Sequence, residues 1–313
     1  MGNAFRTLVV LNPKAGWRLG ERRRSTLLAA IRRTVRDVEF VETAGPGDAT
    51  RRVREGLRAG AEQIVSIGGD GTHHEVLNGF FEEDGRPVRD GAVLAPLPGG
   101  TGGDFRKTLG YGRNPLELVA LLGDRATRPC DVGHLAYFDR DGRPATRWFL
   151  NIASFGLGGL VDDLVNRSSK AFGGFVSFAA ATVRALARFR PQVVRLQLND
   201  RPEVIRTISV VACANGRWFG GGMQIAPDAR LDDGLFDVVT LPAQSLVDYL
   251  LRGHRVYAGT HVTLPGVIVE RARKVVAEPF DPDEAVLLDV DGEALGRLPA
   301  TFELRTGLLR LKA

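Results

Sequence analysis

Cysteine is scarce in this sequence: among 313 residues only Cys130 and Cys213 are present. Two cysteines cannot build a disulfide framework, and neither has a Cys or His nearby at zinc-ligand spacing, so we expect a protein of the reducing cytosol. No apolar run approaches the roughly 18 residues that indicate a transmembrane helix. The N-terminus also lacks the apolar core of a signal peptide, and we therefore expect no secretion.

Several phosphoryl-transfer motifs are absent as well. The chain has no Walker loop (GxxxxGK[ST]) and none of the HRD and DFG elements of protein kinases, which excludes those two classes. Phosphoryl transfer in general needs only a phosphate cradle, a divalent cation and a residue that positions or deprotonates the acceptor hydroxyl. Other sequence patterns can supply these three parts.

Charge and length point to a two-domain globular protein with an anionic partner. The composition is 44% hydrophobic and 25% charged, and 313 residues exceed the usual single-domain size. The net charge is +5, and the sequence pI is about 9.5. Arginine clusters such as 22–24 and 32–33 fit nucleotide phosphates, nucleic acid or an anionic membrane, although solvated helix faces explain any single cluster equally well.

The first 128 residues alternate between apolar strands and amphipathic helices. This alternation predicts a parallel sheet with helices on both faces. Its loops after the strands gather at one edge, so we expect the three Gly-containing loops (12–16, 68–72 and 99–104) to converge there. The predicted strands are 7–11, 38–42, 64–67 and 92–97, and the helices are 21–36, a second one around Val53 and Leu57, a third after Thr72, and 115–122.

From 129 to 298 strands dominate, which predicts a β-rich second domain. Two helices are expected within it, at 168–190 and 245–252. The longer one carries phenylalanines at helical spacing, and it serves either as a cover for the core or as an apolar wall for a greasy substrate. The predicted strands are 147–153, 193–199, 204–214, 236–241, 267–271 and 285–290.

The central motif is the stretch from Ile64 to Phe81. A β-branched strand turns through Gly68-Gly69-Asp70-Gly71-Thr72 into a helical pattern, so backbone N–H groups and the helix N-terminus favour a phosphate. Asp70 would repel that phosphate unless a metal or a proton intervenes. The alternative is a plain glycine-rich turn in which Asp70 is the N-cap of the following helix.

Two acidic segments lie in the second half. Residues 226–238 place Asp228, Asp232, Asp233 and Asp237 around a glycine turn, which suits a hard cation such as Mg²⁺ or, equally, a solvated β-turn. Residues 287–293 end a strand with Asp-Gly-Glu, which is either a hairpin turn or the position of a general base.

Taken in order, these motifs resemble one family. NPKAG at 12–16, GGDGT at 68–72, PGGTGGDF at 98–105, NxxxxG at 151–156, LDDGLFD at 231–237 and DGE at 291–293 are similar to the diacylglycerol kinase catalytic superfamily, of the bacterial lipid-kinase type, which is related to sphingosine and ceramide kinases. GGDG alone is shared with NAD kinases and phosphofructokinases.

The resemblance implies an α/β nucleotide domain at 1–128, completed by 299–313, and a β-rich, sandwich-like domain for lipid and metal at 129–298, with the active site in the cleft between them. It implies that Mg²⁺ is bound by the backbone oxygens of Arg230 and Leu235 and the carboxylate of Asp233. It assigns the general base to Asp291 or Glu293 and lets Asp70 act on the phosphates through Mg²⁺. The residues that it implies for ATP are Asn12, Pro13, Lys14, Ala15, Gly16, Thr43, Gly68, Gly69, Asp70, Gly71, Thr72, His73, His74, Thr101 and Asp104.

The sequence departs from the family pattern at two places. Gly103 precedes Asp104 where the family often has Asn, and His73 and His74 stand where an aliphatic residue and often Asn follow the GGDGT loop. Both places lie near the expected cleft, and neither removes a charge that the chemistry needs.

We therefore predict an ATP-dependent lipid kinase that converts diacylglycerol to phosphatidic acid. The alternatives are a kinase for a soluble acceptor such as NAD or a sugar, and a non-catalytic nucleotide- or nucleic-acid-binding module. We expect a cytoplasmic protein that contacts its lipid substrate peripherally at the inner face of the membrane and binds no nucleic acid. Both a monomer and a homodimer are compatible with the sequence.

Overall fold

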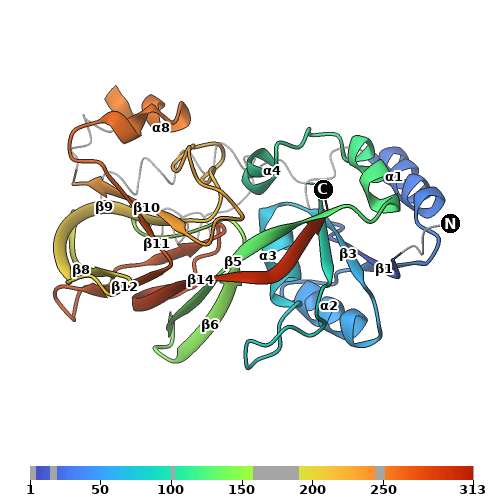
Figure 1. Ribbon diagram of the computed structural model, residues 1–313, viewed down its shortest axis with the longest axis horizontal. Coiled ribbons are helices and arrows are strands. Elements are labelled where there is room, and N and C mark those ends of the chain that lie inside the picture. Colours follow the sequence, from blue (N-terminus) through green and yellow to red (C-terminus); the bar gives the residue numbers. More distant parts are fainter. Residues whose placement is uncertain (1–4, 15–19, 100–102, 158–189, 244–250, 313) are drawn as a thin grey trace. The chain divides into compact units, whose positions relative to one another are not determined.

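Two units make up the chain in the computed structural model, which describes residues 5–14, 20–99, 103–157, 190–243 and 251–312 (Figure 1). Unit 1 is Met1–Val132 together with Thr306–Ala313, and unit 2 is Gly133–Arg305. The chain thus leaves unit 1 within a strand, β5 (Thr127–Asp139), and returns to it within another, β14 (Gly296–Lys312).

Unit 1 is built on a parallel sheet in the order β2-β1-β3-β4, with the end of β14 beside β4. Every residue of β1, β3 and β4 is buried, whereas β2 at the edge is partly exposed. Continuous burial fits central strands that are covered on both faces. The strands are β1 (Thr7–Leu11), β2 (Val38–Glu42), β3 (Gln63–Gly68) and β4 (Val93–Pro98).

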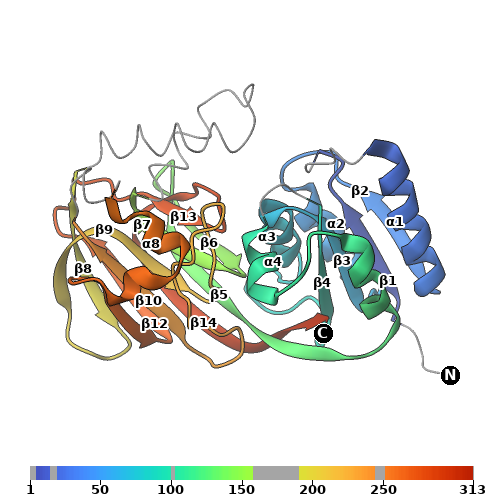
Figure 2. The ribbon, with the colours of Figure 1, turned by 90° about the horizontal axis from the view of Figure 1, so that it is seen from above.

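Helices cover both faces of this sheet. On one face Leu27 and Ile31 of α1 pack with Val9, beside the 3-10 helix η1; Figure 2 shows α1 alongside β1 and β2. On the other face α2 approaches so closely that a Cβ on Gly56 would come within 2.4 Å of Leu8 Cδ2. Leu8 and Val9 are neighbours in β1, so their side chains point to opposite faces. The helices are α1 (Gly20–Thr34), α2 (Asp48–Arg58), α3 (Asp70–Asn78), α4 (Asp104–Leu109) and η1 (Pro115–Gly123).

Unit 2 is dominated by antiparallel strands, which follow the order β11-β10-β9-β8-β12-β14. Strand β9 is long enough to serve three neighbours: its first half pairs with β8, and its second half pairs with β7 and β10. The further strands are β6 (Pro144–Phe149), β7 (Ile152–Gly156), β8 (Gln192–Leu198), β9 (Val204–Ala214), β10 (Phe236–Pro242), β11 (Ile268–Ala272), β12 (Lys274–Pro279) and β13 (Leu288–Val290), with short helices α8 (His254–Tyr257) and η3 (Thr260–Thr263).

The core of unit 2 joins strands that are far apart in the sequence. Phe149 stacks on Phe236 with ring centroids 5.7 Å apart, and Phe155 stacks on Phe302 at 5.8 Å. These four side chains are fully buried in one apolar cluster. Such aromatic pairs bury large areas, so they bring β6, β7, β10 and β14 together.

The fold class predicted from the sequence is confirmed: an α/β unit with helices on both faces and a β-rich second unit. Several details differ. The helix expected at 115–122 is 3-10, the strand expected at 147–153 is divided into β6 and β7, and the strand expected at 285–290 is reduced to β13. Helix α4 and strands β5, β12 and β14 were not predicted. The helices expected at 168–190 and 245–252 lie almost wholly outside the described residues. Within the described part, no helix combines the length and apolarity needed to span a membrane.

Candidate functional site

The loops after β1, β3 and β4 touch one another at one edge of the unit 1 sheet. The Asn12 N–H donates to the carbonyl of Ile67 at 3.1 Å, and the Gly99 N–H donates to the carbonyl of Gly68 at 2.8 Å. The Asn12 side chain donates to Thr72 Oγ1 at 3.0 Å. Adjacent parallel strands direct their following loops to the same edge, where ligands bind in α/β sheets.

Thr43 lies at the same edge. Its N–H donates to the carbonyl of Leu11 at 2.9 Å, so the end of β2 is joined to the end of β1. Lys14 is exposed, and its N–H donates to Asn12 Oδ1 at 2.9 Å. The loop after β1 therefore offers an exposed ammonium group beside a fixed turn. Ala15, Gly16 and Thr101 lie outside the described residues.

Glycine is required where these loops approach most closely. A Cβ on Gly68 would lie 2.4 Å from Thr72 Cβ, and a Cβ on Gly99 would lie 3.1 Å from the Gly68 nitrogen. The first distance is shorter than any real contact of a Cβ atom. The second would press a Cβ atom against a backbone nitrogen, which cannot move aside as a flexible side chain can. The glycines thus let the backbones meet without side chains between them, as a backbone cradle for phosphate demands.

Asp70 has partners that the sequence did not reveal. Its carboxylate accepts backbone hydrogen bonds from Gly103 at 3.1 Å, Asp104 at 3.0 Å and Phe105 at 3.2 Å. Asp70 is the first residue of α3, whose N-cap is Gly69, so it does not cap its own helix. It binds the beginning of α4 instead. Both of its oxygens are engaged, and the loop after β4 is held against the loop after β3.

Three further residues of the motif are buried. Asp104 is 6% exposed, and its Oδ1 accepts a hydrogen bond from Lys107 Nζ at 3.0 Å. His73 and His74 are 4% and 3% exposed, and His73 Nδ1 lies 2.8 Å from Ser66 Oγ in β3. The His73 ring is thus tied to the strand beneath the loop. This contact joins α3 to β3 and so stabilises the turn between them.

In unit 2, Asp291 repeats the arrangement of Asp70. Its carboxylate accepts the N–H groups of Leu150 at 2.9 Å and of Asn151 and Ile152 at 3.0 Å each. Its own N–H donates to the carbonyl of Ile152 at 2.9 Å. Asp291 has a φ of +51°, a left-handed conformation in which Asp is tolerated better than most residues. The Asp-Gly-Glu turn is therefore tied to the segment between β6 and β7.

Glu293 differs from Asp291 in the exposure of its side chain and in the hydrogen bonding of its carboxylate, and both properties bear on proton transfer. Its backbone exchanges two hydrogen bonds with Val290, at 3.0 Å each, which close a tight turn. Its side chain is exposed, and its carboxylate has no hydrogen-bond or ion-pair partner among the described residues. Of the two acidic residues in the triplet, Glu293 is the one with free acceptor oxygens.

The 150–152 segment also contacts residues 215–218, and the sequence did not predict these contacts. Asn151 is 5% exposed; its side chain donates to the carbonyl of Trp218 at 2.6 Å, and its carbonyl accepts the N–H of Gly216 at 2.8 Å. Asn215 donates to the carbonyl of Leu150 at 2.7 Å. The sequence signal was only the isolated polar dipeptide Asn215-Gly216 after the apolar strand β9.

The acidic turn at 230–237 is held by an arginine. Arg271 Nη2 pairs with Asp233 Oδ2, and Arg271 Nε donates to Asp237 Oδ1 at 3.2 Å. The other oxygen of Asp233 accepts the N–H of Leu235 at 3.1 Å. Burial raises the pKa of Asp237, and Arg271 opposes this rise.

The resemblance implied a Mg²⁺ site made of the backbone oxygens of Arg230 and Leu235 and the carboxylate of Asp233. In this structure each oxygen of that carboxylate accepts a hydrogen bond from a protein donor, and the Arg271 guanidinium group lies beside it.

Two family models match the chain, one on each side of the junction near residues 135–151. The diacylglycerol kinase catalytic domain model matches residues 6–135, and the YegS C-terminal NAD kinase beta sandwich-like domain matches residues 151–313. The chain is 33% identical over 98% of its length to a Pseudomonas aeruginosa protein named "Probable lipid kinase YegS-like", of which 93% is covered.

Two further relatives extend the likeness. A diacylglycerol kinase of Bacillus subtilis is 27% identical over 95% of this chain and 92% of its own length. A crystal structure of a diacylglycerol kinase from Bacillus anthracis shares the fold with a TM-score of 0.70, at 22% identity and covering 99% of this chain and 98% of that one. The fold and the full-length matches define a lipid kinase. The chain belongs to the diacylglycerol kinase family, within its YegS-like lipid kinases.

Proposed function

We propose that this protein phosphorylates a lipid hydroxyl with ATP, and that its substrate is diacylglycerol, which becomes phosphatidic acid. The observation that supports the donor side most directly is the hydrogen-bonded meeting of three glycine-containing loops at one sheet edge, through Asn12, Gly68 and Gly99. The acceptor class is supported by the lipid kinases to which the chain is similar over nearly its whole length.

In this proposal the nucleotide phosphates bind the backbone of the loops after β1, β3 and β4. Lys14 supplies an exposed positive charge, and Gly68 and Gly69 allow the phosphates to approach the backbone. The remaining nucleotide-binding residues keep the roles that the resemblance implied: Asn12, Pro13, Ala15, Gly16, Thr43, Asp70, Gly71, Thr72, His73, His74, Thr101 and Asp104. Their contribution is the shape of the loops more than direct charge.

Asp70 acts in this proposal as a positioning residue. Its three backbone hydrogen bonds stabilise the carboxylate and fix Gly103–Phe105 relative to the GGDGT loop. A carboxylate whose oxygens already accept N–H groups repels phosphate less than a free one. This role removes the conflict between a negative side chain and a phosphate site.

Glu293 is the proposed general base. It accepts the proton of the lipid hydroxyl as the hydroxyl oxygen forms a bond to the γ-phosphorus and the bond to the ADP oxygen breaks. Asp291 holds the turn that carries Glu293, because its own oxygens are engaged by residues 150–152. A divalent cation carried by ATP supplies charge neutralisation at the phosphates, and we assign no step to the turn at 230–237.

The test is transfer of label from γ-labelled ATP in neutral mixed micelles. We expect labelled phosphatidic acid from diacylglycerol, no label on NAD or on sugars, and loss of labelling in Glu293→Gln. Labelling of NAD or of a sugar in preference to every lipid would show a soluble-acceptor kinase instead. Nucleotide binding without any labelled product would show a non-catalytic module.

A further inference from the structure

Most of the net charge of the chain lies in one short segment. Residues 20–37 contain six arginines against Glu21 and Asp37, so this segment carries +4 of the total +5. The segment comprises α1 and the turn that follows it. The remaining charged residues of the chain nearly cancel, and the surplus positive charge is therefore local.

Arg22 and Arg33 lie on the side of α1 that faces away from the sheet, opposite the buried Leu27 and Ile31. Leu27 and Ile31 are 1% and 0% exposed, whereas Arg22 and Arg33 are exposed. Arg22 and Arg33 are 11 positions apart, which is close to three full helical turns, so they lie on one line along the helix. Ser25 is also on this side, but its hydroxyl donates to the carbonyl of Arg22 at 2.9 Å.

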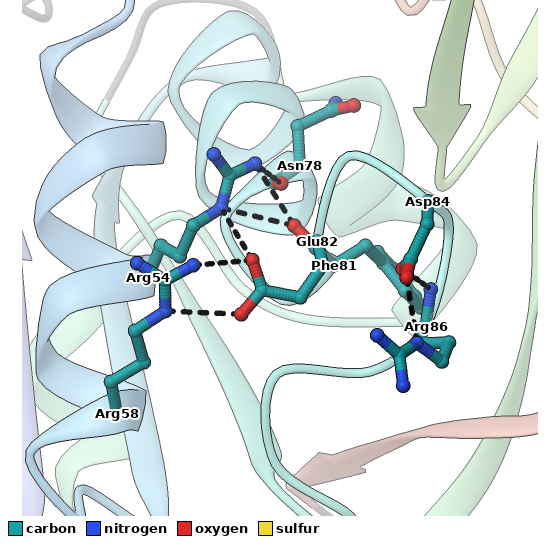
Figure 3. Close-up of polar contacts among 7 residues, drawn as sticks. All are labelled: Arg54, Arg58, Asn78, Phe81, Glu82, Asp84 and Arg86. Atoms are coloured by element: carbon teal, nitrogen blue, oxygen red, sulfur yellow. Dashed lines mark hydrogen bonds and ion pairs between the residues drawn. The ribbon is translucent and has the colours of Figure 1, made fainter.

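The neighbouring helix α2 has a similar number of arginines, but they are neutralised. Arg51 pairs with Asp48 at 2.5 Å and with Glu55 at 2.8 Å. Arg54 donates to the carbonyl of Phe81 at 2.9 Å, and Arg58 pairs with Glu82 at 2.5 Å (Figure 3). Arg54 and Arg58 thus hold α2 against the chain that follows α3, whereas Arg51 is paired within α2. Their positive charges therefore already have partners within the protein.

Of the six arginines at residues 20–37, only two have such partners in the described part of the chain. Arg24 pairs with Glu42, and Arg32 lies over the ring of Phe40 at 4.8 Å from its centroid. In the described part of the chain, the other four have no ion pair. We call these four the arginine face; they are Arg22, Arg23, Arg33 and Arg36.

We propose that the arginine face docks the protein onto bilayers that contain anionic phospholipid. This inference rests on the proposed function, because a kinase of a bilayer lipid has to work at that surface. Guanidinium groups bind phosphate bidentately, and each basic residue near an anionic bilayer adds to the attraction. Leu27 and Ile31 are committed to the core, so α1 cannot insert its apolar side. The contact is electrostatic, and salt must weaken it.

The first experiment is flotation with liposomes of neutral phosphatidylcholine, alone or with about 30 mol% phosphatidylglycerol, at salt from about 0.1 to 0.5 M. The wild type should float with the anionic liposomes only, and less at the higher salt. Arg22→Gln/Arg33→Gln should bind roughly 30-fold more weakly, whereas Arg22→Lys/Arg33→Lys should stay within about threefold of the wild type. A melting curve for each variant checks that it is folded.

The matched control is Arg51→Gln/Arg58→Gln, which removes the same charge from partly exposed arginines that are already paired. We expect it to lose less than about threefold, because its positive charges are neutralised locally. Equal losses in the two double variants would overturn the proposal, since binding would then follow total charge. Equal binding to neutral liposomes, or tighter binding to a duplex DNA at the same salt, would also overturn it.

Failure of docking can be distinguished from failure of the proposed function. In neutral detergent micelles Arg22→Gln/Arg33→Gln should label diacylglycerol like the wild type. Lipid labelling without arginine-dependent flotation refutes the docking surface alone. Flotation of a protein that labels no lipid refutes the proposed function alone.

Discussion

The carboxylate of Asp291 accepts the backbone N–H of Asn151 at 3.0 Å, across 140 positions of sequence. Asp70 does the same for Asp104, also at 3.0 Å and across 34 positions. In both cases an Asp-Gly dipeptide holds a distant loop through neighbouring amides. A carboxylate that is bound in this way is first of all a structural anchor.

The first prediction separates the two acidic residues of the Asp-Gly-Glu turn. Glu293→Gln should lower kcat by roughly 10²- to 10⁴-fold with little change in melting temperature, because Glu293 is exposed and unpaired. Asp291→Asn should lower the melting temperature clearly, because an amide nitrogen would face backbone donors. The checks are steady-state kinetics and thermal melting of both variants. The opposite result would be an Asp291→Asn variant that is inactive but fully stable, together with a Glu293→Gln variant that stays active. It would make Asp291 the general base in place of Glu293.

The second prediction concerns Asp70. Asp70→Asn should destabilise the protein by about 1–3 kcal/mol and raise the KM for ATP more than it lowers kcat, because the loop after β4 loses its anchor. Asp84→Asn is the control: Asp84 pairs only with Arg86 in an exposed turn (Figure 3). Urea unfolding and ATP titration measure both effects. A wild-type KM in Asp70→Asn would show that this anchor does not shape the nucleotide site.

The third prediction concerns the turn held by Arg271. Without nucleotide, neither Mg²⁺ nor EDTA should shift the melting temperature of the wild type, because the Arg271 guanidinium group already pairs with both Asp233 and Asp237. Arg271→Gln should melt lower and should regain stability when Mg²⁺ is added. Calorimetry with and without the metal measures this. A fall in wild-type stability with EDTA would mean that a cation occupies the turn after all.

The fourth prediction concerns His261, which is 1% exposed and whose Nε2 lies 3.0 Å from the carbonyl oxygen of Ile225. Burial lowers its pKa below the ordinary 6.5, so the unfolded chain takes up a proton before the folded protein does. Stability should therefore fall as the pH drops below about 6.5, by at most about 1.4 kcal/mol per pH unit for this group.

His261→Gln tests this pH dependence. Glutamine stays uncharged at every pH, so the variant should show a flatter decline of the unfolding free energy between about pH 7 and pH 5. Urea unfolding at several pH values gives both slopes. Identical slopes for the variant and the wild type would assign the acid sensitivity to other groups.

Much of unit 1 was predictable because its signals are local. The strand Ile64–Ile67, the glycines after it and the spacing of Leu27 and Ile31 each report on backbone conformation and burial within a few residues. Parallel strand order then brings the loops together by geometry. Strand β14 was missed although its polar and apolar residues alternate, because Pro299 and Gly307 interrupt the pattern and because the strand runs from unit 2 into unit 1.

By itself, the sequence determined the two-part architecture, the glycine loops and the family, since periodicity, glycine positions and motif order are properties of the chain alone. Only the tertiary structure decided what the charged side chains do. Asp70 and Asp291 are engaged by backbone amides, whereas the Glu293 carboxylate has no hydrogen-bond or ion-pair partner in the part of the chain that the structure describes. The arginines of α2 are paired, whereas the arginine face of α1 is not. The reason is physical: a charge is neutralised by whatever lies within a few ångströms, and the fold decides which distant residues those are.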